Sequence, residues 1–376
     1  MDIRRLPENL INQIAAGEVV ERPSSALKEL IENSIDADAT QIDITIDNGG
    51  KNLISVSDNG IGIKKNLIPM AIERHATSKL PNNDLNKIAY LGFRGEALPS
   101  IAAVSELNIQ TKFIDSNQAW SLDVAAGNFN KVYPSSRQTG TIISVKKLFY
   151  ATPARLKFLK SAQVEKSYCH QIILKQALAN PLVGFKFQAD AREIFNIRPE
   201  IEDENSYLNR IRNIMGLNFS NEAIKIENSK LIKENEFANI YGFIGLPTLN
   251  KSNYNQQHLF INGRFIQDRN LSGAIRAAYR ETLPKGRFPV FCLFINVPSE
   301  FIDVNVHPGK TEVRFQDNAL IRSLIVGSIS RELHISYSET TTDLSKEALK
   351  RFDNATELSP NIQNKTNQSF FEHGDV

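Results

Sequence analysis

The sequence contains few cysteines and has no long hydrophobic run. Its 376 residues include two cysteines, Cys169 and Cys292, far apart and without the CxxC or metal-ligand spacing of a redox or zinc site. This scarcity is typical of a reducing compartment, and we expect both thiols to be buried. The most apolar stretch, residues 288–297, is far too short to span a bilayer.

The chain also lacks a marked charge and the pattern of a secretory leader. Arg4 and Arg5 are not followed by an apolar core before a cleavage-like site. The formal net charge is +2, so any contact with nucleic acid has to come from a local basic patch. We expect a cytoplasmic globular protein with no membrane partner.

The sequence has no GxxxxGK[ST] pattern, which excludes a P-loop nucleotide site. It does have an amphipathic segment from Ser24 to Asp36 whose apolar residues recur at helical spacing. On its polar stripe, Glu29 and Asn33 are four residues apart and project from one face about one turn apart. Such a stripe is most often a solvated face, and for Glu32 and Asp36 we expect structural roles.

Two glycine-bearing loops follow this helix. Residues 58–62, Asp-Asn-Gly-Ile-Gly, lie at a strand end, where a buried carboxylate can accept a hydrogen bond from an exocyclic amine and glycines let the backbone approach a flat ring. Residues 92–95, Gly-Phe-Arg-Gly, precede a helix expected to begin near Glu96, whose N–H groups can bind an anion. Alone, the first pattern is more often a simple turn, and the second is a moderately specific signal for an anion site.

Periodicity predicts the remaining elements. In the first half we expect strands at 41–47, 53–57, 107–113, 120–124, 141–149 and 183–187, and a helix over 163–178. In the second half we expect strands at 240–244, 258–266, 290–297 and 304–306, and helices over 268–281 and 317–333. The first two strands form a hairpin, which favours a mixed or antiparallel sheet over a doubly wound parallel one.

These patterns predict an α/β fold in two domains. The expected parts are an N-terminal arm (1–22), a first α/β domain (23–199), a second α/β domain (200–335) and a polar linker or disordered tail (336–376). We expect the arm to pack on another surface rather than to join a core, and the Phe158–Leu159 pair to be in the core.

Six motifs, in this order, resemble the MutL family of DNA mismatch-repair ATPases, part of the GHKL superfamily with gyrase B, Hsp90 and histidine kinases. They are NQIAAGEVVERP (12–23), KELIENSIDA (28–37), DNGIG (58–62), RHATSK (74–79), GFRGEAL (92–98) and DVNVHP (303–308). The first and fifth are specific to MutL within the superfamily. The resemblance covers about residues 1–335 and implies a GHKL (Bergerat) α/β sandwich with a mixed sheet, followed by a smaller ribosomal-S5-like α/β domain.

The resemblance also implies roles for residues at matching positions, with ATP and Mg²⁺ as cofactors. Glu29 is the implied general base and Asn33 the implied Mg²⁺ ligand. Asp58, with Gly60 and Gly62 in its loop, is implied to read adenine, and Thr141 to lie beneath the ring. Lys310 is implied to reach the γ-phosphate from the second domain. The implied phosphate lid consists of Thr77, Ser78, Lys79, Gly92, Phe93, Arg94, Gly95, Glu96, Ala97 and Leu98.

The implied function is a slow ATP-hydrolysing switch in DNA mismatch repair. It would couple the mismatch-recognition protein MutS to a downstream nuclease or helicase through nucleotide-driven homodimerisation and DNA binding. The alternative is an ATP-binding scaffold in which hydrolysis is incidental. Family members usually continue into a C-terminal dimerisation domain, so we expect a fragment or a truncated protein.

Basic residues predict a sequence-independent DNA surface. Its expected members are Arg155, Lys157, Arg264, Arg269 and Arg276, with Arg280, Lys285 and Arg287 beside them. Contacts of this kind are salt-sensitive. Without the resemblance, a solvated helix face is the favoured interpretation. For His75 and His307 we expect structural roles, because no second metal ligand has suitable spacing.

Overall fold

The computed structural model describes residues 4, 11, 14, 16, 17, 19–79, 90–92, 95–303 and 313–336. Residues up to Ser330 form one compact unit, described here. From the following unit the structure describes residues 331–336, which are helical. The predicted strand 304–306, Phe93, Arg94, His307, Lys310 and the tail from 337 lie outside the described residues.

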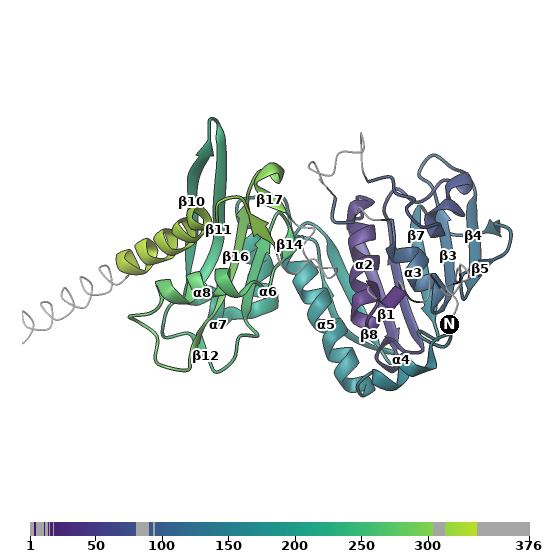
Figure 1. Ribbon diagram of the computed structural model, residues 1–376, viewed down its shortest axis with the longest axis horizontal. Helices are drawn as coiled ribbons and strands as arrows, with labels where there is room; N and C mark the ends of the chain where they lie inside the picture. The colour runs from purple at the N-terminus through teal and green to yellow at the C-terminus, as the bar shows by residue number, and fades with distance from the viewer. Residues whose placement is uncertain are drawn as a thin grey trace, which may run out of the picture. The chain divides into compact units, whose positions relative to one another are not determined.

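The first domain is built on a mixed β-sheet with the strand order β5-β4-β3-β7-β2-β1-β8-β9, in which β6 pairs with β4 (Figure 1). β1 and β2 form the predicted antiparallel hairpin, and β1 also pairs in parallel with β8. The predicted mixed sheet is therefore confirmed. Its strands are β1 (Gln41–Asp47), β2 (Leu53–Asp58), β3 (Glu106–Lys112), β4 (Ala119–Ala125), β5 (Asn128–Phe129), β6 (Tyr133–Ser135), β7 (Gly140–Lys146), β8 (Gly184–Ala189) and β9 (Arg192–Ile197).

Two long helices, α2 (Pro23–Asp36) and α5 (Ala162–Ala179), pack side by side against this sheet (Figure 1). α2 begins at Pro23, where the missing N–H costs no helical hydrogen bond. Its residues Leu27, Leu30 and Ile31 are at most 1% exposed and join the isoleucines of β1 in one core. The shorter helices are α3 (Ala97–Ala103) and α4 (Pro153–Phe158), with 3₁₀ turns η1 (Asn48–Gly50), η2 (Lys65–Leu67) and η3 (Met70–Ile72).

Two packing predictions for this domain are wrong. Ala16 and Val20 of the arm are fully buried in the core, because small apolar side chains four residues apart share one helical face. Phe158 is 84% exposed, because it ends the short helix α4, whereas its neighbour Leu159 does pack against the core.

The second domain contains a mixed sheet with the strand order β10-β11-β16-β13-β14, in which β13 and β16 pair in parallel. Its elements are α6 (Ser206–Met215), α7 (Leu217–Asn221), β10 (Ala223–Lys233), β11 (Glu236–Gly245), β12 (Asn250–Lys251), β13 (Gln257–Ile261), β14 (Arg264–Phe265), α8 (Arg269–Ala278), β15 (Phe288–Pro289), β16 (Phe291–Asn296), η5 (Ser299–Phe301), β17 (Ile302–Asp303) and β18 (Arg314–Phe315), with a further helix over 318–336. Stacked rings fill its core: the Phe294 centroid lies 5.0 Å from that of Phe260 and 5.2 Å from that of Tyr241.

The single strand predicted over 258–266 is instead the hairpin of β13 and β14. Asn262 and Gly263 turn the chain with φ of 47° and 75°, respectively. An Asn-Gly pair between apolar runs is a strong signal for such a turn, so the sequence carried the information. The turn places Arg264 on a separate short strand, which matters for the site.

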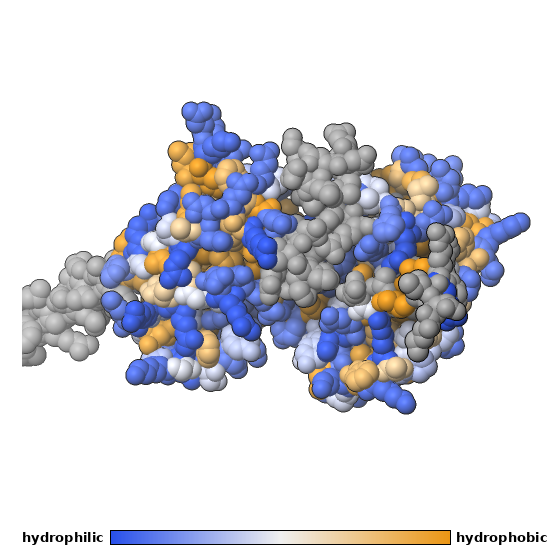
Figure 2. Space-filling view, viewed as in Figure 1, coloured by the Kyte–Doolittle hydropathy of each residue, from blue (hydrophilic) through white to orange (hydrophobic). Residues whose placement is uncertain are grey.

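The described helices include none that is both long enough and apolar enough to cross a membrane. Hydrophilic residues cover most of the face seen in Figure 2, and hydrophobic residues gather there in small groups. Both cysteines are buried, as predicted, and burial raises the pKa of the Cys169 thiol to about 12.

Arg210 on α6 is a fully buried cation that joins three chain segments. Its Nη2 donates to the carbonyl oxygens of Pro181, Val183 (2.9 Å) and Arg198 (3.0 Å), and its Nε lies 3.7 Å from a carboxylate oxygen of Glu200. Burial lowers the pKa of Arg210 to about 10, against the opposing effect of Glu200. The residue thus ties α6 to the loop before β8 and to the end of β9.

We predict that Arg210→Met lowers the free energy of unfolding by about 3–5 kcal/mol, because three carbonyl oxygens lose their donor and the Glu200 carboxylate loses its ion-pair partner. Arg212→Met is the matched control, since Arg212 lies exposed on the same helix, and a change within about 0.5 kcal/mol is expected there. Chemical unfolding measures both. Equal losses in the two variants would contradict this role of Arg210.

Candidate functional site

A cavity of about 580 Å³ lies between α2, the end of β2 and the segments that follow it. It brings together most of the site residues predicted from the sequence: Glu29, Asn33, Asp58, Gly62, Thr77, Ser78, Lys79, Gly92, Gly95, Glu96, Ala97, Leu98 and Thr141. Gly60 does not line it. Phe93, Arg94 and Lys310 lie outside the described residues, so their predicted roles stay predictions.

The polar face of α2 forms one wall of this cavity. Glu29 and Asn33 both line it, as their spacing predicts. Lys28 Nζ lies 2.9 Å from Glu32 Oε1 and 3.5 Å from Glu29 Oε1. Burial lowers the pKa of Lys28, but the two carboxylates together raise it above its ordinary value. A positive charge therefore stays beside Glu29, whose side chain is 16% exposed.

Asp58 is held at the end of β2 by three donors. Its Oδ1 accepts the backbone N–H groups of Gly60 (3.0 Å) and Thr141 (3.1 Å), and its Oδ2 lies 3.0 Å from the Ser34 hydroxyl. Burial raises the pKa of Asp58, and these hydrogen bonds oppose the rise. A carboxylate has about four acceptor positions, so this fixed group can still accept a hydrogen bond from the cavity.

The glycines after Asp58 are needed by the packing of the chain on itself. Gly62 has φ of +73°, and a Cβ there would lie 2.1 Å from the carbonyl oxygen of Lys112. A Cβ on Gly60 would lie 2.4 Å from the carbonyl oxygen of Ala37. Glycine is therefore needed at position 60 so that the loop can pack against the end of α2. This packing differs from the predicted role, in which Gly60 lets the backbone approach a flat ring.

Beneath Asp58, two threonines form a buried polar pair. Thr141 Oγ1 lies 3.1 Å from Thr111 Oγ1, which accepts the N–H of Ile63 at 2.9 Å. Thr111 is not among the site residues predicted from the sequence, although it is a polar residue at a buried position of an alternating strand. Around this pair the cavity is apolar, as a flat ring requires; its lining includes Val56, Ile61, Ile63, Met70, Leu98, Phe113 and Ile143.

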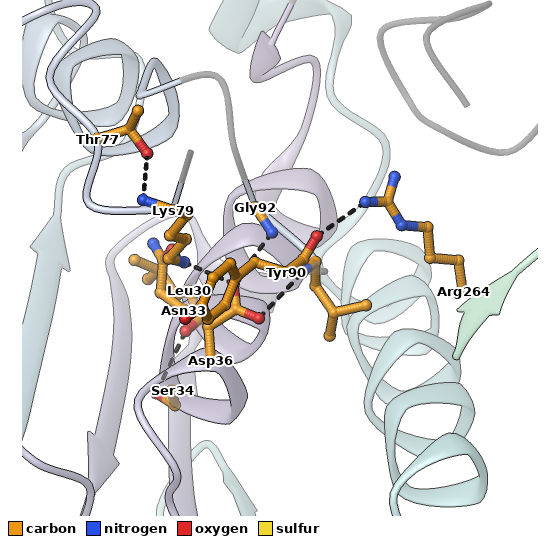
Figure 3. A network of polar contacts seen from close by, with 10 residues as sticks. Leu30, Asn33, Ser34, Asp36, Thr77, Lys79, Tyr90, Gly92 and Arg264 are labelled. Atoms are coloured by element: carbon orange, nitrogen blue, oxygen red, sulfur yellow. Dashed lines mark hydrogen bonds and ion pairs between the residues drawn. The ribbon is translucent and has the colours of Figure 1, made fainter. Parts of the chain in front are cut away.

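The far end of the cavity is polar, and Lys79 enters it. Lys79 Nζ lies 2.7 Å from Asn33 Oδ1 and 2.6 Å from Asp36 Oδ2 (Figure 3). Asp36 also accepts the backbone N–H groups of Leu91 (2.9 Å) and Gly92 (3.0 Å). Asp36 follows Asn33 by three residues on α2. Its contacts with Lys79 and Gly92 connect α2 to the two segments of the predicted lid.

The two described parts of the predicted lid contact each other. The N–H of His75 donates to the Gly95 carbonyl at 3.2 Å, and His75 Nδ1 lies 3.7 Å from Glu96 Oε1. Gly95 has φ of +63°, and a Cβ there would lie 2.5 Å from the carbonyl oxygen of Ala76. α3 begins at Ala97, next to the predicted Glu96. His75 therefore has a contact that suits the predicted structural role.

The residues at the polar end fit a hard cation. Asn33 and Asp36 already direct two oxygen atoms at a positive charge, the ammonium of Lys79. Oxygen ligands of this kind suit Mg²⁺, which keeps several waters and phosphate oxygens in its shell. Among the described residues no group of three His, Cys, Asp or Glu can hold a metal ion, so most ligands would have to come from nucleotide and water.

Two of the predicted DNA-binding arginines are occupied elsewhere. Arg264 is only 9% exposed, and its Nη2 donates to the Tyr90 carbonyl at 2.9 Å. Arg155 packs its guanidinium against the arm, where a Cβ on Gly17 would lie 1.7 Å from Nη2. These contacts compete with the predicted role of both arginines in DNA binding, which stays a prediction. Lys157, Arg269 and Arg276 are exposed, as that prediction requires.

A second, smaller cavity lies at the exposed side of α8. Its volume is about 370 Å³, and four cations line it: Arg276, Arg280, Lys285 and Arg287. Arg276 stacks over the Phe288 ring with its Cζ 5.0 Å from the centroid, which orders its guanidinium. This cluster is the described surface that best fits the predicted phosphate contacts.

Two family models match this chain. Residues 21–148 match the family described as histidine kinase-, DNA gyrase B-, and HSP90-like ATPase. Residues 211–334 match the C-terminal domain of DNA mismatch repair protein. The first match covers the sheet strands and α2 around the large cavity, and the second covers the sheet of the second domain.

Relatives and solved structures agree with these matches. The DNA mismatch repair protein MutL of Paramagnetospirillum magneticum is 45% identical over 89% of this chain and 54% of its own length. The Aquifex aeolicus MutL ATPase domain complexed with ADP is 25% identical, with a TM-score of 0.55 over 74% of this chain and 93% of that one.

A crystal structure of the N-terminal domain of a DNA repair protein has a TM-score of 0.74 and 24% identity, over 87% of this chain and 98% of that one, and shows the fold alone. The chain spans about half the length of the curated relatives that it matches. With a GHKL-type ATPase domain followed by the mismatch-repair domain in one chain, this protein belongs to the MutL family of DNA mismatch-repair proteins.

Proposed function

We propose that this chain binds and hydrolyses ATP with Mg²⁺ and acts as a nucleotide-driven switch in DNA mismatch repair. The observation that carries the proposal is the large cavity, which Glu29, Asn33 and Asp58 line together. It combines an apolar end with a buried carboxylate and a polar end with oxygen ligands. Adenine suits the first end and metal-bound phosphates suit the second.

Glu29 is the proposed general base. It orients a water in line with the γ-phosphoryl group and takes its proton, which gives ADP and phosphate. Lys28 places a positive charge 3.5 Å from Glu29, although its closer contact is with Glu32, and Glu29 lines the cavity. Mg²⁺, when bound, neutralises charge on the phosphate oxygens, and Asn33 is the residue proposed to hold it.

Asp58 is the proposed adenine reader. Its carboxylate, fixed by Gly60, Thr141 and Ser34, can accept a hydrogen bond from an exocyclic amine but repels a carbonyl oxygen at that place. This favours ATP over GTP. Thr77, Ser78, Lys79 and residues 92–98 are proposed to cover the phosphates, and Lys310 to add positive charge at the γ-phosphate from the second domain.

Beyond the reaction, the proposal includes the partners that the family suggests. Nucleotide binding drives homodimerisation, and the switch couples the mismatch-recognition protein MutS to a downstream nuclease or helicase in the cytoplasm. DNA is contacted independently of sequence by Lys157, Arg269 and Arg276, with the cation cluster beside α8. The support is membership of the family and the exposure of these cations.

The alternative is a scaffold that binds ATP and relays mismatch recognition while hydrolysis is incidental. A non-hydrolysable ATP analogue separates the two functions. Full and repeated activation of the downstream partner with the analogue supports the scaffold. A single round of activation that does not reset supports the hydrolytic switch.

We predict that Glu29→Ala lowers the rate of ATP hydrolysis by about 10²-fold or more, the usual contribution of general-base catalysis, while ATP binding is retained. Phosphate release measures the rate, and calorimetry measures binding. Glu193→Ala is the control, because Glu193 lies exposed on β9. Hydrolysis by Glu29→Ala at the rate of the unmodified chain would show that Glu29 is not the base.

We predict that Asn33→Ala lowers nucleotide affinity by about tenfold or more when Mg²⁺ is present, because the ion loses its proposed protein ligand. When EDTA removes Mg²⁺, the unmodified chain and Asn33→Ala should bind ADP with the same affinity. Calorimetric titration with and without Mg²⁺ measures both affinities. If the Mg²⁺-dependent part of the affinity is unchanged, the metal role of Asn33 is wrong.

We predict that Arg276→Gln with Arg280→Gln weakens binding to duplex DNA of any sequence and lowers the slope of log K against log salt by about 0.9 for each lost phosphate contact. Lys225→Gln, which removes an exposed cation on β10, should leave both the DNA affinity and the salt slope unchanged. Fluorescence anisotropy over a range of salt measures the slope. An unchanged slope in the double variant excludes this cluster from the DNA surface.

A further inference from the structure

We propose that Asp36 is a positioning residue of the nucleotide site: it holds the Lys79 ammonium in the cation position beside Asn33 and clamps segment 90–92, which Arg264 ties to the second domain. The inference rests on the proposed function, because the cation position has meaning only if Asn33 binds a metal. The sequence assigned Asp36 no more than a structural role.

The ammonium of Lys79 lies against the oxygen atom of Asn33 that is proposed to bind the metal ion. Its Nζ is 2.7 Å from Asn33 Oδ1 and 2.6 Å from Asp36 Oδ2. The side chains of Asp36 and Lys79 are only 5% and 18% exposed, so solvent screens this pair weakly. A divalent cation arriving at Asn33 meets a like charge at short range, and Lys79 has to move away.

The carboxylate of Asp36 uses its contacts to hold the neighbouring segment. Oδ1 accepts the Leu91 N–H at 2.9 Å, and Oδ2 accepts the Gly92 N–H at 3.0 Å as well as the ammonium. Gly92 permits this approach, because a Cβ there would lie 3.2 Å from Lys79 Nζ and 3.5 Å from Asp36 Oδ2. Charge-assisted hydrogen bonds of this kind are stronger than neutral ones.

Arg264 continues the chain of contacts into the second domain. From β14 its Nη2 donates to the Tyr90 carbonyl at 2.9 Å, so segment 90–92 is held on one side by Asp36 and on the other by Arg264 (Figure 3). Arg264 is buried and 174 residues from Tyr90 in the chain. Displacement of Lys79 removes the positive charge beside Asp36 and thereby changes how Asp36 holds this segment, a change that reaches the second domain through Arg264.

The clamp is tested in the nucleotide-free chain by amide hydrogen exchange. In Asp36→Asn the side chain keeps its size but loses its charge, and we expect the peptide that contains Leu91 and Gly92 to exchange about tenfold faster. Asp38→Asn is the matched control, since Asp38 is exposed two residues away and Asn also adopts its φ of 58°. Arg264→Gln should also accelerate exchange in this peptide.

The cation position is tested with Mn²⁺ as the probe, by its electron paramagnetic resonance in the presence of ADP. We expect Lys79→Met to lower the half-saturating Mn²⁺ concentration about fivefold, because the competing charge is gone. Lys225→Met, which removes an exposed cation on β10 outside the cavity lining, should leave it unchanged. An equal or higher half-saturating concentration in Lys79→Met overturns this part of the inference.

The two experiments separate this inference from the proposed function. If the unmodified chain binds neither ADP nor Mn²⁺, the proposed function and the cation position both fail. If it binds both, and the peptide of Asp36→Asn exchanges as slowly as that of Asp38→Asn, the clamp is wrong while the function stands. Faster exchange in Asp36→Asn together with tighter Mn²⁺ binding in Lys79→Met supports the whole inference.

Discussion

The register of α2 against the first sheet is the constraint on which the site depends. Leu27, Leu30 and Ile31 are buried almost completely, and the helix has no freedom to rotate without exposing them. Because a helix repeats every 3.6 residues, this burial points Glu29, Asn33 and Asp36 into the cavity one above another. A rotation of one residue would bring either Leu30, Ser34 and Ala37 or Lys28, Glu32 and Ile35 to these positions. The burial that stabilises the core therefore also fixes the geometry of the site.

The sequence predicted the parts of the structure that local patterns encode. The hairpin of β1 and β2, the mixed sheet, α5 and the gathering of the motif residues around one cavity are all found. The strands β9 and β10 were not predicted, because they lie at the edges of their sheets and bury few residues. The turn at Asn262 and Gly263 was not predicted either, although an Asn-Gly pair is a strong turn signal. The roles of the site residues came from family resemblance, and the geometry alone supports them without testing them.

What the sequence could not predict depends on contacts between distant segments. The contact of Arg264 with Tyr90 joins positions 174 residues apart, and no pattern around Arg264 distinguishes it from the exposed arginines of α8. The same holds for Arg210, whose three carbonyl partners lie on other segments. The prediction that Phe158 is buried was wrong for a different reason. An aromatic residue beside Leu159 is typical of a core, but Phe158 is the last residue of α4 and its side chain is exposed.

Together these contacts describe a cavity, proposed as the nucleotide site, whose polar end is held by charge. Asp36, Lys79 and Asn33 form one group, and the segment 90–92 links that group to β14 of the second domain. A crystal structure with a non-hydrolysable ATP analogue and Mn²⁺ tests this account most directly, because the anomalous signal locates the ion. We predict the ion at about 2.1 Å from Asn33 Oδ1, a hard-cation distance, with Lys79 Nζ moved away from that oxygen. Density for the nucleotide with no ion at Asn33, or with Lys79 still bound there, would contradict it.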